Sequence, residues 1–368
     1  MEDPRGGQGK RHPLLSVVLI AILATIGGAN GWEDMEVYGQ AQAEWLGTFL
    51  EFPHGIPKAD CYRRLFMRLA PQALQQCFWQ WIEDIVTLTG GTVIPIDGKT
   101  MRHSYDRIEA QSALHVVSAW ASEHRLMLGQ VKVDRKSNEI TAIPALLKLL
   151  DISGCIITID AIGTQTAIAA QIIAQGGDYI LALKENHPTL YQQVNALFEQ
   201  AKQTEFEGMD VSSDQRVEGG HGRREVRTVW VLSVAALDEA LYGQAQWAGL
   251  QSIVMVHRRR RLNNGTVSEE TQFFLSSLAP EAERIGKAIR LHWGIENQLH
   301  WVLDVTFGED DSRIRKGHGP ENMTLLRRMA IGALNQETTS KRSIRQKAKF
   351  AAMRPDYMLK VLASAIEQ

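Results

Sequence analysis

The order of strand-like and helix-like segments between residues 92 and 184 is the strongest constraint on how this 368-residue chain can fold. Three strand-like runs come first, and then helix, strand, helix and strand follow. These runs are residues 92–97, 113–120 and 126–133, followed by 140–150, 155–160, 165–175 and 179–184. Short connections between alternating strands and helices are typical of a sheet with parallel pairs. The segment therefore predicts a mixed α/β sheet.

The first 90 residues read as helical, and Leu14–Ile26 is their most apolar segment. As a helix it would span about 20 Å, which is less than the roughly 30 Å hydrocarbon core of a membrane. A cleaved signal segment or an anchor is the alternative, because a basic start precedes the apolar run. The three cysteines have no disulfide or zinc spacing and fit buried thiols in a reducing compartment. We therefore expect a buried core helix.

Three regions are predicted along the chain. Residues 1–90 form a helical N-terminal domain, residues 91–335 form the α/β domain, and residues 336–368 form a basic helical tail. Residues 187–275 lack the alternation of strands and helices, and we interpret them as an insertion. A helix follows that starts at Ala282 and runs through Glu296 toward Asp304. The predicted fold is thus βββαβαβ, insertion, α, behind a small helical domain.

Three carboxylates are the candidate catalytic and metal-binding residues. Asp97 and Asp160 each end an apolar strand, and Glu296 lies on the later helix. Strand ends of an open α/β sheet border the crevice in which ligands bind, and clustered carboxylates attract divalent cations. Two ions about 3.5–4 Å apart can hold the attacking and leaving oxygens of a phosphodiester. On the residues alone, the alternatives stay open: Asp97 as a turn residue, and Asp160 as a helix N-cap.

The helix near Glu296 leaves further alternatives. His292, Glu296 and His300 recur every four residues, so a zinc site is a rival, although the HExxH spacing is absent. A solvated polar face is a third interpretation. The nearby acids Glu309 and Asp310 offer a different third ligand. Glu296 is preferred because it lies in mid-helix.

Several motifs resemble one protein family nearly from end to end. They are Ile96-Asp-Gly-Lys-Thr100; Gly129-Gln with Lys136-Ser-Asn-Glu-Ile-Thr-Ala-Ile-Pro144; Thr158-Ile-Asp-Ala; Gly176-Gly-Asp-Tyr-Ile-Leu-Ala-Leu-Lys184; His221-Gly-Arg-Arg-Glu-Val-Arg227; and His292-Trp-Gly-Ile-Glu-Asn with Leu299-His-Trp-Val-Leu-Asp-Val-Thr-Phe307. In this order and spacing the chain resembles DDE-type insertion-sequence transposases of the H-repeat-associated (Rhs-element) branch. His292 and Leu303 stand where many related transposases carry Arg and Lys.

The resemblance implies a ribonuclease-H-like core with Asp97, Asp160 and Glu296 as the metal-binding triad. It implies two Mg²⁺ or Mn²⁺ ions, cleavage of double-stranded DNA at terminal inverted repeats and strand transfer into target DNA. A homodimer is expected because two DNA ends must meet. The expected location is the cytoplasm, at the nucleoid and not at a membrane. A catalytically silent, domesticated DNA-binding relative is the alternative function.

The overall charge does not indicate nucleic-acid binding, because 40 Lys and Arg face 42 acids and the net charge is −2. DNA contacts must therefore come from local clusters. The candidate DNA-binding residues lie in the matched motifs or in the arginine run 258–261, although a solvated face is the other interpretation of any charge run. These candidates are Lys99, Lys184, Arg223, Arg227, His292, Arg258 and Arg259.

Overall fold

The computed structural model describes residues 1–6, 10–85, 88–105, 112–133, 138–220 and 222–366. Lys136 and His221, which belong to the motifs above, lie outside these residues. The chain divides into two compact units. Unit 1 comprises Met1–Thr87, Gly98–Lys136 and Ile295–Gln368, and unit 2 comprises Leu88–Asp97 and Ser137–Gly294.

Among the described residues, nine strands form one mixed sheet in the order β3-β2-β1-β4-β5-β9-β8-β7-β6. Their bounds are β1 Val93–Met101, β2 Leu114–Ala121, β3 Leu126–Lys132, β4 Ile156–Ile159, β5 Asp178–Leu183, β6 Val211–Gly220, β7 Arg223–Ser233, β8 Ser252–Leu262 and β9 Val267–Ser276. β4 pairs in parallel with β1 and with β5, whereas β2–β3 and all pairs from β5 to β6 are antiparallel. The predicted mixed α/β sheet is confirmed, and the predicted insertion adds four antiparallel strands to it.

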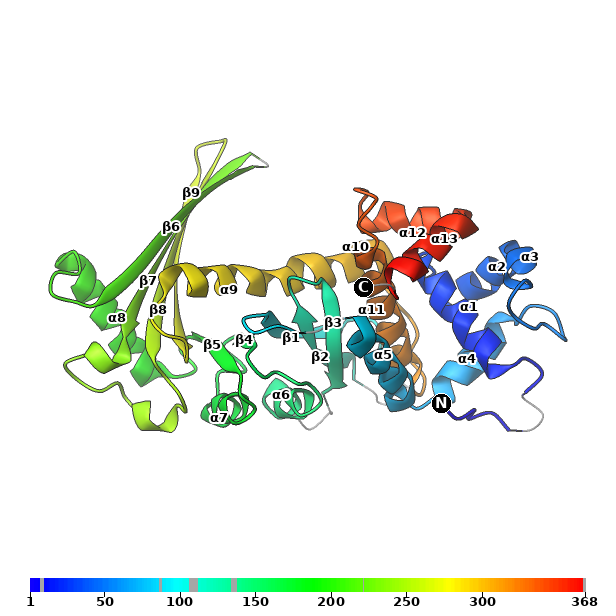
Figure 1. Ribbon diagram of the computed structural model, residues 1–368, viewed down its shortest axis with the longest axis horizontal. Helices are drawn as coiled ribbons and strands as arrows, with labels where there is room; N and C mark the ends of the chain where they lie inside the picture. The colour runs from blue at the N-terminus through cyan, green and yellow to red at the C-terminus, as the bar shows by residue number, and fades with distance from the viewer. Residues whose placement is uncertain (7–9, 86–87, 106–111, 134–137, 221, 367–368) are drawn as a thin grey trace. The chain divides into compact units, whose positions relative to one another are not determined.

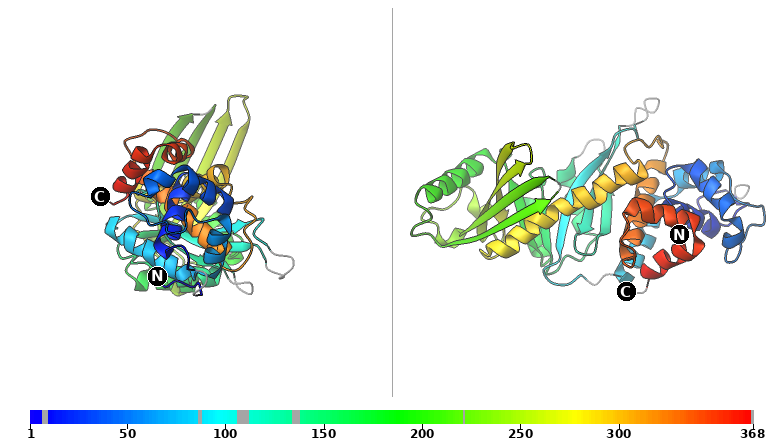
Figure 2. Two further views of the ribbon diagram at one scale, coloured as in Figure 1. Left: turned by 90° about the vertical axis from the view of Figure 1, so that its right-hand side faces the viewer. Right: turned by 90° about the horizontal axis from the view of Figure 1, so that it is seen from above.

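In unit 2, helices cover both faces of the sheet (Figure 1). They are α6 Glu139–Leu147, α7 Thr166–Ala174, α8 Pro188–Gln203 and α9 Ala282–Gly294, and two short 3₁₀ turns lie at Val234–Ala236 and Gln244–Gln246. The view from above shows α9 running along the sheet (Figure 2). Its buried residues Ile285, Ala288 and Ile289 form a core with Ile156 and Val254 on the strands. This one-sided apolar stripe at helical spacing explains why the segment forms a surface helix packed on the sheet.

Unit 1 is largely helical beside β2, β3 and the end of β1. Its helices are α1 Leu14–Ile26, α2 Trp32–Ala41, α3 Ala43–Leu46, α4 Ala59–Arg68, α5 Pro71–Ile85, α10 Trp301–Phe307, α11 Gly319–Gln336, α12 Ile344–Met353 and α13 Pro355–Ser364. The expected core helix Leu14–Ile26 is confirmed, because residues around its circumference are buried. Of the helices among the described residues, none has the length and apolar character needed to cross a membrane.

Several element ends differ from the sequence predictions. β1 does not end at Asp97 but continues to Met101, and the arginine run 258–261 forms part of β8. The polar residues 211–220, which lie in the predicted insertion, form β6, and each of them pairs with β7. Of the three free thiols expected to be buried, only Cys155 is, whereas Cys77 is exposed.

Candidate metal centre

Asp97 lies in the middle of β1, where the strand changes from buried to partly exposed. The four residues before it, Val93–Ile96, are buried and pair with β4, whereas Asp97 is half-buried. The apolar half anchors the strand in the sheet, and side chains along a strand alternate between its two faces. Asp97 is therefore held on a rigid element.

Glu296 lies on a π-helical segment, Ile295–His300, that joins α9 to α10. The sequence predicted a continuous α-helix with His292, Glu296 and His300 in one row. The wider turn breaks that row, because each residue bonds to the fifth residue along the chain rather than the fourth. Ile295 and Leu299 remain buried, while Glu296 is exposed and His300 is only 8% exposed. Single π-helical turns within α-helices are frequent at functional sites.

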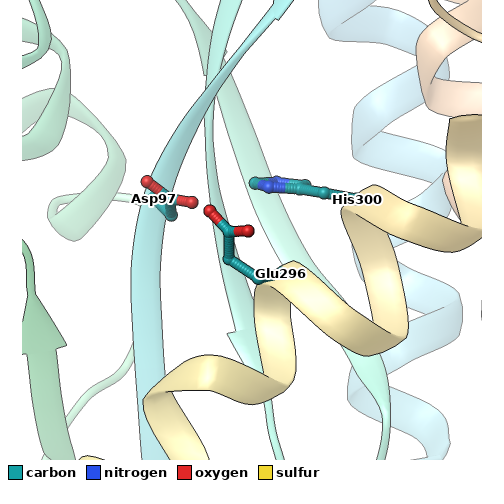
Figure 3. Close-up of side chains that lie close together, drawn as sticks. All are labelled: Asp97, Glu296 and His300. Carbon is teal, nitrogen blue, oxygen red and sulfur yellow. The ribbon is translucent and has the colours of Figure 1, made fainter. Parts of the chain in front are cut away.

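Asp97, Glu296 and His300 form one group of potential metal ligands. One ligand atom of each residue lies within 4.8 Å of those of the other two. Figure 3 shows the carboxyl groups of Asp97 and Glu296 facing each other, with the His300 ring directed toward them.

The donor atoms in this group fit a divalent cation. Carboxylate oxygens are suited to Mg²⁺ and Mn²⁺, and a neutral imidazole binds transition metals. Burial and the nearby charges of Arg328 and Lys99 lower the pKa of His300 to about 3. The ring is therefore neutral near pH 7, in the form that binds a metal. Two adjacent carboxylates repel each other, and a cation would relieve that repulsion.

Asp160 follows β4 and is the third predicted carboxylate. Ile96 of β1 pairs with Ile159 of β4, and these two strands are parallel. Asp97 and Asp160 each follow one member of that pair directly. Asp160 is nevertheless outside the ligand group, because its Oδ1 accepts backbone N–H bonds from Ile162 at 3.1 Å and Gly163 at 3.4 Å. It thus caps a turn of its own loop, while Gln165 is the N-cap of α7. Burial, with the charge of Glu139 as a smaller cause, raises the pKa of Asp160.

A cavity of about 550 Å³ in unit 2 borders Asp160. Lys184 and His292, both predicted to contact DNA, line the same cavity. The His292 Nδ1 lies 2.9 Å from Thr158 Oγ1, and burial lowers the pKa of its ring to about 4. Lys184 is exposed at the rim. His292 therefore faces this cavity, while His300 belongs to the ligand group.

The predicted DNA contact Lys99 lies in a partly buried ion pair, in which the side chain of Asp304 is 34% exposed. The Lys99 side chain is only 10% exposed, and its Nζ lies 2.7 Å from Asp304 Oδ2 and 3.7 Å from Asp310 Oδ1. Glu309 is fully buried, 3.0 Å from Arg328 Nη1. Both acids that were the alternative third ligand thus have cationic partners, and neither belongs to the ligand group found among the described residues.

Three arginines of β8 pair with acids on neighbouring strands, whereas Arg227 of β7 pairs with an acid on its own strand. Arg258 pairs with Glu270, and Arg259 with Glu269 at 3.1 Å. Arg227 and Arg260 share the buried Glu225. We call these seven residues the arginine ladder. Beyond the ladder, Arg223, Arg224 and Arg261 are exposed, and Arg224 lies directly opposite Arg261 in the register. No ion pair involves Arg224 or Arg261 within the described part of the chain.

Sequence reasoning missed Asp304 and gave no separate role to His300. His300 was named only as part of a row with His292. Asp304 lies within a matched motif, but 205 positions separate it from its partner Lys99. A pairing over that distance leaves no periodic signal in one sequence.

Comparisons with known proteins give consistent findings. A family model described as "Transposase DDE domain" matches residues 88–332, and one described as "DDE_Tnp_1-associated" matches residues 1–82. The putative protein YbfL of Escherichia coli (strain K12) is 39% identical over 99% of this chain and 96% of its own length. The H repeat-associated putative transposase YhhI of the same strain is 39% identical over 96% of this chain and 93% of its own length.

Two further similarities are more distant. The putative transposase YncI of Escherichia coli O157:H7 is 36% identical over 98% of this chain and 92% of its own length. The solved structure of the piggyBac transposase synaptic complex with hairpin DNA aligns with a TM-score of 0.42 and 11% identity, over 99% of this chain and 75% of that one. That structural likeness is too weak to carry a conclusion about the fold.

Proposed function

The chain belongs to the transposase DDE domain family, and on this premise we propose that it is a DNA transposase. It cleaves strands at terminal inverted repeats and transfers the freed ends into target DNA. The observation that carries this proposal is the group of Asp97, Glu296 and His300, whose donor atoms suit a divalent cation. Mg²⁺ or Mn²⁺, when bound, would neutralise charge developing on the phosphodiester and favour attack by water or a 3′-hydroxyl.

We assign the ligands as follows. Asp97 and Glu296 supply carboxylate oxygens, and His300 supplies a neutral ring nitrogen. Asp160 joins them, as the ligand needed for a second ion, once it gives up its bonds to the Ile162 and Gly163 backbone. Its position beside Asp97 in the register supports this assignment.

We also propose a ribonuclease-H-like core within residues 91–335. Support comes from the order β3-β2-β1-β4-β5, in which a three-strand unit precedes two parallel strands. Residues 187–275 would be the insertion, with 1–90 and 336–368 as the flanking helical parts. Double-stranded DNA is the proposed partner, bound by a homodimer at the nucleoid, with the exposed Lys184 and Arg223 contacting phosphates.

The test is cleavage of labelled oligonucleotides that carry the terminal repeats of the element, in Mg²⁺, in Mn²⁺ and in EDTA. We expect cleavage only with metal, and a loss of about 100-fold or more in Asp97→Asn, Asp160→Asn and Glu296→Gln, because even outer-shell partners of a metal are worth 10–100-fold. Glu199→Gln makes the same chemical change at a carboxylate on α8 that pairs with Lys202 and lies outside the ligand group, so it serves as the matched control. Cleavage in EDTA, or full activity of the three variants, would contradict the proposal.

A catalytically silent DNA-binding protein is the second candidate. The specific observation in its favour is that Asp160 is engaged by its own loop. This candidate predicts tight binding to the terminal repeats but no cleavage in either metal. The oligonucleotide assay therefore separates the two functions directly.

A further inference from the structure

Lys99 is a largely buried lysine two residues after Asp97 on β1, and the side chain of its partner Asp304 is 34% exposed. Lysine side chains are seldom this buried unless they are paired. The ammonium lies 2.7 Å from Asp304 Oδ2 and 3.7 Å from Asp310 Oδ1, and only 10% of the side chain is exposed. Its charge is therefore neutralised inside unit 1 and is not presented to a DNA phosphate.

The partner of Lys99 lies on the helix that carries the other potential ligands. Asp304 is in α10, which begins directly after the π-helical segment with Glu296 and His300. Four residues, about one helical turn, separate His300 from Asp304. The ion pair thus joins β1, two residues after Asp97, to α10, which follows the segment with Glu296 and His300.

A second set of contacts holds the same two segments together. Asp310, in the loop after α10, lies 3.3 Å from Arg102 through Oδ2, and its backbone oxygen lies 2.6 Å from the His103 ring. Arg315 in turn donates to the His103 carbonyl at 3.0 Å. The end of β1 is therefore tied to the chain that follows α10 at several points.

An ion pair with a partly exposed carboxylate adds little net stability by itself, because water weakens the attraction between the two charges. Its fixed geometry is the more informative property. We propose that Lys99 is a positioning residue: its ion pair with Asp304 keeps Asp97 at metal-binding distance from Glu296 and His300. This inference rests on the proposed function, and it replaces DNA contact as the role of Lys99.

Mn²⁺ binding to the full-length protein, measured by electron paramagnetic resonance without DNA, tests the proposal. We expect Lys99→Met to raise the Mn²⁺ Kd at least about 10-fold, the size of effect seen for residues that orient metal ligands. Binding of terminal-repeat DNA in EDTA should be unchanged. Lys347→Met is the matched control, because Lys347 is also buried at 7% exposure and lies 3.7 Å from Glu337, while it contacts none of the three ligands.

The outcomes separate the possible roles of Lys99. An unchanged Mn²⁺ Kd in Lys99→Met, or equal losses in Lys99→Met and Lys347→Met, would overturn the positioning role. Loss of DNA affinity in EDTA with Mn²⁺ binding intact would restore DNA contact. If Lys99→Met does not fold, Mn²⁺ binding by Asp304→Asn is measured instead. An unchanged Mn²⁺ Kd in that variant also overturns the proposal. A wild-type protein that binds Mn²⁺ but cuts no DNA would refute the proposed function while the positioning role is still judged by Kd.

Discussion

Two sets of ion pairs in this molecule differ mainly in their exposure to water. Glu309, Arg327 and Arg328 in unit 1, which we call the buried network, are at most 1% exposed. In the arginine ladder of unit 2 the pairs around Glu225 are buried or partly buried, whereas the side chains of the Arg259–Glu269 pair are 61% and 52% exposed, and this pair is the one compared with the buried network. Exposed pairs contribute little to stability, whereas removing one partner of a buried pair leaves a charge without water. The same residue types should therefore have very different energetic consequences in the two regions.

Glu309→Gln should have the largest effect on stability. The substitution leaves Arg327 and Arg328 buried without a carboxylate, and their existing bonds to the Asn30 and Thr324 carbonyls are to neutral groups. We expect the free energy of unfolding to fall by about 3–5 kcal/mol. Urea denaturation followed by circular dichroism measures this change.

Glu269→Gln is the matched control in the arginine ladder. It should lower the free energy of unfolding by at most about 1 kcal/mol, because both members of its pair are half-exposed. Similar losses in the two variants would show that burial does not distinguish the two regions.

An intermediate effect is expected from His292, which lies at the cavity of unit 2. Desolvation lowers its pKa from 6.5 to about 4 in the folded protein. Between these values the unfolded chain binds more protons than the folded chain, so stability is greatest above pH 6.5 and falls as the pH drops toward 4. Because the His292 residue is partly exposed, the free-energy change is smaller than the full pKa shift would give. We expect His292 to account for about 1–2 kcal/mol of the loss in the free energy of unfolding.

Unfolding of His292→Gln at a series of pH values between 7 and 4 checks this expectation. The variant should lose less stability than the wild type on acidification, with His300 still contributing a loss of the same sign. His54→Gln, at an exposed histidine, is the control. Parallel pH profiles for His292→Gln and the wild type would contradict the assignment.

The order of elements could be predicted because long apolar runs alternate with helical patterns from residue 92 onward. The end of β8 could not, since its outer half is polar and is held by cross-strand pairing rather than by burial. The end of β1 could not either, because the strand continues beyond Asp97 through the polar residues Lys99 and Thr100. The strand β6 left no apolar pattern for the same reason, because almost all of it is exposed.

The candidate site shows a similar division. Asp97 and Glu296 could be named from their places on a strand and a helix, and they lie together. The orientation of the Asp160 carboxyl group could not be predicted, because it depends on two hydrogen bonds from the backbone N–H groups of Ile162 and Gly163. The π-helical segment separates His292 from His300, buries Ile295 and Leu299 and leaves no distinct spacing in the sequence.

The smallest effects are expected within the arginine ladder and at its end, and they concern DNA rather than folding. Arg224 and Arg261 lie opposite each other, whereas Arg259 faces Glu269. A cation without an acidic partner releases more counterions when it contacts a DNA phosphate. Arg224→Ala and Arg261→Ala should therefore each reduce the slope of log K for DNA binding against log salt concentration by about one unit. Arg259→Ala should reduce it by less and change stability by no more than about 1 kcal/mol. Fluorescence anisotropy at several salt concentrations measures the slopes, and equal slopes for the three variants would mean that the cross-strand acids do not screen the ladder from DNA.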